Sequence, residues 1–258
     1  MMYLRFSDRR SEIAMKQDLH VHTIFSDGKS TAEEVVLSAI KKGLDRIGFS
    51  DHSYTTFDNS YCISKDNLEK YLSCIHSLKE KYADKIEVLC GIEQEYFSHA
   101  PTDCYDYVIG SVHYVKVSDR YIPVDESADI LRDAAERYFS GDIYSLVEEY
   151  YKCVGDVIEK TNADIIGHLD LITKFCEKTP LFDMTSPRYL KAAKAAIDKL
   201  LPYGKPFEIN TGAISRGYRT TPYPSAELTD YIKSRGGKFI LSSDSHRADT
   251  VCFGFDEI

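Results

Sequence analysis

Histidine and aspartate residues recur at the ends of extended, apolar segments along the whole length of this 258-residue chain. Six of the eight histidines lie in five short motifs of this kind, which are HVH at 20–22, DH at 51–52, SVH at 111–113, GHLD at 167–170 and DSH at 244–246. Imidazole and carboxylate groups together form ligand sets that divalent transition metals accept. Because the motifs are spread along the chain, they can form one site only in a fold that brings the ends of many separate elements together.

The remaining pattern predicts alternating strands and helices. Seven extended apolar segments are predicted as strands, at 17–23, 46–50, 86–92, 107–114, 163–169, 206–211 and 238–243. Helical patterns lie between them at 65–83, 143–160, 187–202 and 224–235, each long enough for a crossover between parallel strands. A first helix is predicted to open with the capping box Ser30-Thr-Ala-Glu33 and to end at Gly43. The polar segment 115–140 interrupts the alternation and is expected to be a lid or a surface loop.

This alternation is compatible with a closed barrel or with an open, doubly wound sheet. Every predicted strand except the sixth has a candidate ligand at or just beyond its C-terminal end, and the sixth ends in Glu208-Ile-Asn210. Barrel enzymes gather their chemistry at this face, whereas an open sheet brings together only the strands beside its switch point. We therefore expect an α/β fold with a seven-stranded (β/α)7 TIM-like barrel, as a single domain over residues 16–258. Residues 1–15 are expected to be a disordered or non-native extension, and the sequence leaves open whether a helix follows the last strand.

Composition restricts the partners of the chain. Its formal net charge of −9 is spread over the sequence, and such an acidic surface repels the phosphate backbone of nucleic acids. The seven cysteines form no CxxC pair, which is typical of scattered thiols in a reducing compartment. We find no apolar run of membrane-spanning length and no signal-peptide pattern, so the sequence predicts a cytoplasmic protein without a membrane partner.

Nine side chains are predicted to converge as metal ligands. The HVH motif directs both of its imidazoles to one face of a strand, Asp27 follows in the next loop, and Glu93 ends the third strand, where a carboxylate can bridge two cations. One zinc ion takes three or four protein ligands, so the set implies two or three divalent ions of zinc, manganese or iron. The candidate ligands are His20, His22, Asp27, His52, Glu93, His113, His168, Asp244 and His246. His76 and His99 lack such context and are expected at the surface.

The combined motifs resemble those of the polymerase and histidinol phosphatase (PHP) superfamily. They are DLHVHTIFSDG, FSDH, GIEQEY, GSVH, GHLD and SSDSH, and the similarity extends from about Lys16 to Phe255. The resemblance implies a distorted seven-stranded β/α barrel with a di- or trinuclear metal site. It implies three ligand groups, namely His20, His22, Glu93 and Asp244; Glu93, His113 and His168; and Asp27, His52 and His246. Family members carry either His or Asp at the position of Asp27, so an Asp there is expected to weaken or change the third site.

The RGYR tetrapeptide beginning at Arg216 resembles the stand-alone histidinol-phosphatases, which implies hydrolysis of L-histidinol phosphate to L-histidinol and phosphate. A phosphomonoester dianion suits guanidinium groups, so Arg216 and Arg219 are predicted to contact the phosphate and assist catalysis, with Tyr218 beside them. Asp170 is a candidate proton donor to the leaving alcohol. Glu95 is a candidate for binding the substrate ammonium or imidazole. An acidic rim suited to a cationic leaving group is expected from Glu95, Asp103 and Asp170.

Three further polar residues are expected to orient imidazoles rather than to bind metal directly: Asp18, Glu208 and Asn210. Alternative functions stay open at this point. A phosphodiesterase or nucleotidase of the same superfamily would keep the metals but lack the RGYR segment, and a polymerase proofreading module would belong to a longer chain with a basic surface. A non-catalytic metal-binding regulator would tolerate a broken ligand set, whereas the set here is intact.

Overall fold

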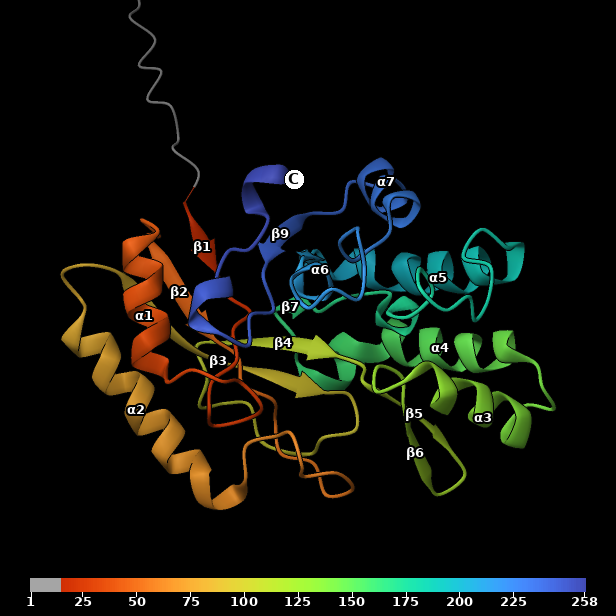
Figure 1. Ribbon diagram of the computed structural model, residues 1–258, viewed down its shortest axis with the longest axis horizontal. Helices are drawn as coiled ribbons and strands as arrows, with labels where there is room; N and C mark the ends of the chain where they lie inside the picture. The colour runs from red at the N-terminus through yellow and green to blue at the C-terminus, as the bar shows by residue number, and fades with distance from the viewer. Residues whose placement is uncertain (1–14) are drawn as a thin grey trace, which may run out of the picture.

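The computed structural model describes residues 15–258, so the expectation for residues 1–15 falls, apart from Met15, outside the described residues. Seven parallel strands form the central sheet in the order in which they occur along the chain (Figure 1). They are β1 (Gln17–Asp18), β2 (Arg46–Phe49), β3 (Glu87–Glu95), β4 (Tyr107–Ser111), β7 (Ile165–Ile166), β8 (Phe207–Asn210) and β9 (Phe239–Ser242).

The sheet curves until its first and last strands meet. Just beyond β1 and β9, Val21 and Ser245 form a parallel bridge. The amide of His22 donates to the carbonyl of Ser245 at 2.8 Å, and the amide of Ser245 donates to the carbonyl of His20 at 3.1 Å. The seven parallel strands are thus nearly closed into a barrel, which confirms the predicted fold class and excludes the open, doubly wound sheet.

Two strands are much shorter than their apolar segments predicted. β1 and β7 contain only two residues each, although the segments 17–23 and 163–169 read as strands. Beyond β1, side-chain oxygens that follow β2 accept from backbone amides of this segment, so no regular ladder to β2 continues there. The amide of Val21 donates to Ser50 Oγ at 3.1 Å, and the amide of Thr23 donates to Asp51 Oδ1 at 2.8 Å. These side-chain bonds hold the segment beside the end of β2.

Helices connect the strands and cover the outside of the barrel. α1 (Ala32–Lys41) and α2 (Leu68–Lys81) lie beside the first strands, and α4 (Ile143–Thr161) and α5 (Pro187–Leu200) lie together near the later ones (Figure 1). The short α6 (Gly212–Ser215) and α7 (Ala226–Ser234) follow β8. Within residues 15–258, no helix combines the length and apolar character needed to cross a membrane.

The capping box of α1 lies one residue later than predicted. Thr31 is the N-cap, its Oγ1 accepts from the amide of Glu34 at 3.3 Å, and Glu34 Oε2 accepts from the amide of Thr31 at 2.8 Å. Ser30 is engaged elsewhere, because its Oγ accepts from the amide of Ala248 at 3.0 Å. The sequence contains two overlapping capping-box patterns, one that starts at Ser30 and one that starts at Thr31. The hydrogen bond from Ala248, which lies 218 residues further along the chain, engages Ser30 and leaves Thr31 as the cap.

The segment 115–140 is not the polar lid or surface loop that its composition predicted. It contains an antiparallel hairpin of β5 (Tyr114–Val117) and β6 (Arg120–Pro123), followed by α3 (Ala128–Tyr138). Val115, Ile122 and Leu131 are buried in the larger hydrophobic core, so apolar burial anchors this insertion to the barrel wall.

The interior of the barrel is filled on the side away from the ligand cluster. Tyr107 is buried inside it, and its hydroxyl donates to the carbonyls of Leu19 at 2.5 Å and Phe49 at 3.0 Å. After β9, the chain continues in two 3₁₀ turns, Ala248–Thr250 and Phe255–Glu257, and no α-helix follows within the described residues. Val251 packs fully buried beside α1, so these turns occupy the place of a closing helix.

Candidate metal centre

The nine candidate ligands converge at the C-terminal ends of the strands, as the strand-end pattern predicted. Glu93 lies within β3, and the other eight come from the segments that follow β1, β2, β4, β7 and β9. Seven of them line a cavity of about 160 Å³, and His20 and His22 lie fully buried. The two histidines excluded from this set, His76 and His99, are exposed.

Glu93 lies at the centre of the cluster. Its Oε1 is 2.9 Å from His168 Nε2 and 3.3 Å from His113 Nε2, whereas its Oε2 is 2.8 Å from His52 Nδ1. The same Oε2 lies 3.4 Å from His20 Nε2 and 3.5 Å from His22 Nε2. One carboxylate therefore faces five imidazoles from four different segments, which is the arrangement expected of a bridging ligand.

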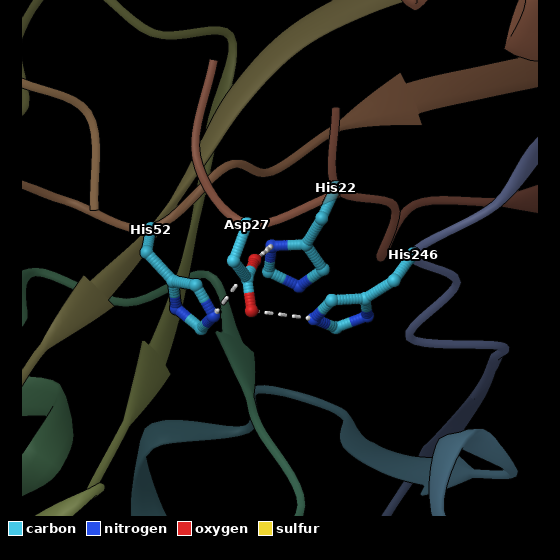
Figure 2. A group of neighbouring side chains, drawn as sticks. All are labelled: His22, Asp27, His52 and His246. Atoms are coloured by element: carbon cyan, nitrogen blue, oxygen red, sulfur yellow. Dashed lines mark hydrogen bonds and ion pairs between the residues drawn. The ribbon is translucent and has the colours of Figure 1, made fainter. Parts of the chain in front are cut away.

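The ligand atoms form three overlapping groups, and within each group they lie within 4.8 Å of one another. The groups are His20, His22 and Asp244; His52, Glu93 and His113; and His22, Asp27, His52 and His246. Figure 2 shows the third, in which Asp27 points between His52 and His246 with Oδ2 3.1 Å from His246 Nε2. His22 and His52 each belong to two groups, so the division differs in detail from the one implied by the family resemblance.

Several buried polar atoms of this cluster have no hydrogen-bond partner within the described part of the chain. They are His20 Nε2, both ring nitrogens of His22, His168 Nδ1, and Glu93 Oε2, whose approach to His52 is not a hydrogen bond in geometry. An unsatisfied buried polar atom costs about 1–3 kcal/mol, and such atoms in native proteins call for an ion or another partner. Nitrogen and carboxylate oxygen donors in this number fit divalent transition metals.

The protonation states of the cluster also suit metal binding. Burial, together with the neighbouring His246 and His52, lowers the pKa of His22 to about 3, so its imidazole is neutral at pH 7. Burial opposes ionisation of Glu93, but the surrounding imidazoles, His20 first among them, hold its pKa well below the ordinary value. Metals bind neutral imidazole and ionised carboxylate, which are the forms of His22 and Glu93. Burial opposes protonation of His20 and His113, but the facing carboxylates raise the pKa of both, so metal binding would displace protons from these two rings.

Two buried glutamates orient imidazoles from behind. Glu208 Oε1 lies 2.6 Å from His20 Nδ1, and its Oε2 accepts from the amide of His168 at 2.9 Å. Glu95 Oε2 lies 2.9 Å from His113 Nδ1 and accepts from the amide of His113 at 2.9 Å. With hydrogen on Nδ1, His20 and His113 direct the Nε2 lone pair toward Glu93. Asn210 supports Glu208, to which its Nδ2 donates at 3.1 Å.

Asp18 differs from the expectation that it orients an imidazole. Its carboxylate accepts from the amides of Ser243 at 3.2 Å and Cys252 at 2.9 Å. It therefore fixes the start and end of the loop that carries Asp244 and His246, and acts on those ligands only through the backbone.

Local backbone geometry places the two aspartate ligands. Gly28 follows Asp27 in a tight turn, and a Cβ at Gly28 would lie 2.6 Å from the carbonyl carbon and oxygen of His22. Asp244 adopts a left-handed conformation with φ 47°, which is uncommon for a residue other than glycine. Strained backbone of this kind concentrates at functional sites.

Arg216 lies at the cavity, but it is also tied to a candidate ligand. Its Nη2 donates to Asp244 Oδ2 at 2.9 Å, and its Nη1 donates to the carbonyl of Asp244 at 2.7 Å. Arg216 and Tyr218 both line the cavity at the metal cluster. The sequence correctly placed these two residues at the site, although the ion pair with Asp244 was not foreseen.

Arg219 and Asp170 occupy a different environment from the one predicted. Arg219 is buried, donates to Thr173 Oγ1 at 2.6 Å and stacks its guanidinium over the ring of Tyr223 at 4.5 Å. Asp170 is fully buried 3.9 Å from Arg219 and accepts from the amide of Ser225, the residue that precedes α7. Neither residue lines the cavity. These contacts favour structural roles over phosphate contact and proton donation.

The expected acidic rim is therefore not where the sequence placed it. Glu95 is buried behind His113, Asp170 is buried beneath α7, and Asp103 is exposed in the loop between β3 and β4. Sequence spacing indicates which face of a strand a residue occupies, but not how deeply it lies or which partner it binds.

Two residues at the cavity were missed. Asp125 follows the β5–β6 hairpin, and Lys174 follows the 3₁₀ turn after β7. Lys174 Nζ donates to the carbonyl of Asp125 at 2.8 Å, lies 3.3 Å from its Oδ2, and lies 4.7 Å from the ring centroid of Tyr218. A signal existed for Lys174, which closely follows the GHLD motif, but Asp125 lay in a segment interpreted as a loop.

Comparisons with known proteins agree with this geometry. The chain is 28% identical over 254 residues to a probable histidinol-phosphatase of Deinococcus radiodurans, covering 92% of this chain and 89% of that protein. A solved structure from Listeria monocytogenes superposes with a TM-score of 0.79 at 21% identity, covering 94% of this chain and 99% of that one, which supports the fold. The histidinol phosphate phosphatase of Lactococcus lactis, complexed with zinc, L-histidinol and phosphate, superposes with a TM-score of 0.68 at 25% identity, covering 90% of this chain and 87% of that one.

A family model for the PHP domain matches residues 18–212, which include seven of the nine candidate ligands. The remaining two follow β9 and join the same cluster in space. Sequence motifs, barrel and ligand cluster thus point the same way, and the chain belongs to the PHP domain family.

Proposed function

We propose that this protein is a metal-dependent phosphomonoesterase that hydrolyses L-histidinol phosphate to L-histidinol and inorganic phosphate. The observation that carries the proposal is the charge arrangement at the cavity. Buried nitrogen and oxygen ligands form one wall, and the cations Lys174 and Arg216 line the same cavity. The names of the relatives and the ligands of the Lactococcus lactis structure support this substrate.

The three groups of side chains around Glu93 would hold the metals. His20, His22 and Asp244 would form one site. Glu93 would join it to a second site with His113 and His168, because its Oε2 lies beside His20 and its Oε1 beside His168. Asp27 and His246, with the neighbouring His52, would form a third. Metals held there would supply Lewis acidity toward a phosphoryl group and toward water.

Lys174 and Arg216 would bind the phosphate dianion. Lys174 is held in place by the carbonyl oxygen and the carboxylate of Asp125, and its ammonium group remains at the cavity. Charge-assisted hydrogen bonds to phosphate are roughly twice as strong as neutral ones. The two cations would orient the phosphate and stabilise charge on its oxygens during displacement.

The hydrogen bonds of His246 indicate how Arg216 would become available. His246 Nδ1 lies 2.9 Å from Arg216 Nη1 and 3.1 Å from the carbonyl of Asp244. If His246 offers Nε2 as a ligand, its Nδ1 carries hydrogen and donates to that carbonyl. Arg216 then no longer donates to the ring, and one of its N–H groups is free to contact phosphate.

The proposal is tested by phosphate release from a panel of substrates. Protein stripped with a chelator is reconstituted separately with Zn²⁺, Mn²⁺ and Fe²⁺, and kcat/KM is measured for L-histidinol phosphate, a nucleoside monophosphate and a phosphodiester. We expect no turnover without metal and the highest kcat/KM for L-histidinol phosphate. Undiminished turnover by stripped protein would refute metal dependence, and a higher kcat/KM for the nucleotide or the diester would refute the substrate assignment.

A further inference from the structure

A second cavity opens beside the metal cluster, and among the residues that the structure describes its wall contains acidic side chains but neither lysine nor arginine. We name it the acidic recess; its volume is about 250 Å³, and its wall includes Asp58, Tyr61, Tyr114, Asp125 and Glu126. Drug-sized ligands occupy pockets of roughly 300–1,000 Å³, so the recess suits a small group. It shares part of its wall with the cavity at the metal cluster, so the two spaces adjoin.

The carboxylate of Asp58 is oriented by neutral donors. Ser60 donates its hydroxyl at 2.7 Å and its amide at 3.0 Å to Asp58 Oδ1, and Tyr114 donates its hydroxyl to Oδ2 at 2.8 Å. Partial burial opposes ionisation, but these hydrogen bonds lower the pKa of Asp58 below its ordinary value. Across residues 15–258, neither Asp58 nor Glu126 forms an ion pair with a basic side chain. Their negative charges are therefore available to a ligand.

Aromatic rings complete the recess. Tyr61 and Tyr114 have ring centroids 6.2 Å apart, and Tyr61 packs its ring 4.9 Å from that of His52, one of the residues of Figure 2. The Tyr61 hydroxyl is buried and has no hydrogen-bond partner within the described residues. Aromatic faces attract cations, and a buried hydroxyl normally finds a partner. Both features suit a flat, cationic group carrying N–H donors.

Within the described part of the chain, lysine and arginine side chains therefore line only one of the two adjoining spaces. Lys174 and Arg216 face the cavity at the metal cluster, whereas Asp58 and Glu126 line only the adjoining recess. Asp125 lies on both walls and is neutralised by Lys174. A substrate with a phosphate at one end and a cation at the other would fit this polarity in a single orientation.

We propose that the acidic recess is the subsite for the cationic part of the substrate alcohol, an ammonium or imidazolium group, with Asp58 and Glu126 determining specificity. The proposal rests on the phosphomonoesterase function above. It replaces the acidic rim expected from the sequence, since Glu95 and Asp170 are buried and Asp103 does not line the recess.

The test compares substrates that differ only in the charge of the alcohol. Asp58→Asn and Glu126→Gln, singly and together, are assayed with L-histidinol phosphate and with an uncharged phosphomonoester such as 3-phenylpropyl phosphate. The Asn oxygen would keep the two Ser60 donors, and its NH₂ group would donate to the Tyr114 hydroxyl, which can accept as well as donate, so the fold of the recess is preserved. Glu69→Gln, an equal change of charge at an exposed position in α2, is the control.

We expect kcat/KM for L-histidinol phosphate to fall about tenfold or more in Asp58→Asn, since a hydrogen bond to a charged group is lost. The value for the uncharged ester should change less than about twofold, within the usual range of surface substitutions. Glu126→Gln should act in the same direction, and the double variant should fall further. Equal losses on both substrates, or no loss on either, would refute the subsite.

Binding of the product provides a readout that does not depend on turnover. Calorimetric titration of L-histidinol into metal-loaded protein with inorganic phosphate should give a weaker Kd in both variants, while the Kd for phosphate alone stays unchanged. An unchanged Kd for L-histidinol would also refute the subsite.

The two proposals fail in different ways. If wild-type protein prefers another amine-bearing phosphomonoester, and the variants lose that preference, the subsite stands and the assignment of L-histidinol phosphate fails. If wild-type protein hydrolyses charged and uncharged esters equally well, the subsite fails and the phosphomonoesterase function stands.

Discussion

Replacing Glu208 by glutamine should weaken metal binding without removing any candidate ligand. Glu208 Oε2 accepts from two donors, the amide of His168 at 2.9 Å and Asn210 Nδ2 at 3.1 Å, while Oε1 faces His20 Nδ1 at 2.6 Å. A glutamine side chain has only one acceptor oxygen. We expect this oxygen to face the His168 amide and Asn210 Nδ2, because two donors are present on that side. The glutamine NH₂ group then faces His20 and forces Nδ1 to accept. The neutral ring must carry hydrogen on Nε2, where the metal would bind.

The expected loss follows from this change of tautomer. Mutating a residue that orients a metal-binding imidazole typically costs 10–100-fold in affinity, or about 1.4–2.8 kcal/mol at 1.4 kcal/mol per tenfold. The assay is a competition titration of metal-free Glu208→Gln against a chromogenic chelator, with circular dichroism to confirm the fold. Glu69→Gln serves as the control. Wild-type affinity for every metal equivalent in Glu208→Gln would refute the assignment of Glu208 as a positioning residue.

Three further predictions follow from the same geometry. Arg216→Lys should lower kcat/KM for phosphomonoesters by about tenfold or more, because the ammonium cannot reproduce the paired guanidinium contacts. Gly28→Ala should lower both Tm and metal content, because the new Cβ would lie 2.6 Å from the backbone of His22. In metal-free protein, burial opposes protonation of His20 and His113, but the neighbouring carboxylates raise the pKa of both well above the ordinary value. Their stabilising contribution is complete below pH about 6.5 and is lost as pH rises through the raised values, so Tm should fall on the alkaline side.

Each of these predictions has a clear contrary result. Wild-type kcat/KM in Arg216→Lys would remove the guanidinium from phosphate binding. An unchanged Tm in Gly28→Ala would show that the turn tolerates a side chain. A Tm of metal-free protein that rises or stays level above pH 6.5 would show that His20 and His113 are not stabilised as cations.

The sequence predicted the barrel and the position of the ligand cluster because both depend on local pattern. The strand-end motifs place His52, His113 and Asp244 at one face whichever residues surround them. Local pattern failed where a distant contact decided the outcome. Ser30 and Thr31 are equivalent N-cap candidates in the sequence, and only the hydrogen bond from the Ala248 amide to Ser30 distinguishes them.

The substrate side of the site was harder to predict for the same reason. Lys174 and Asp125 are 49 residues apart and meet only through the folded hairpin insertion. Arg219 and Glu95 share faces with site residues, yet each is buried against other partners. Alternation along a strand specifies direction, whereas depth and pairing depend on the packing of the whole chain.

The central claim, that one carboxylate joins a polynuclear metal site, is tested most directly by counting metal equivalents in wild-type protein and in Glu93→Gln. Both are purified without chelator, reconstituted and measured by mass spectrometry of the elements. We predict two or three equivalents per chain in the wild type and a loss of more than one equivalent in Glu93→Gln, since Glu93 faces five imidazoles from four segments. One equivalent or less in reconstituted wild-type protein, or full metal content in Glu93→Gln, would contradict the account.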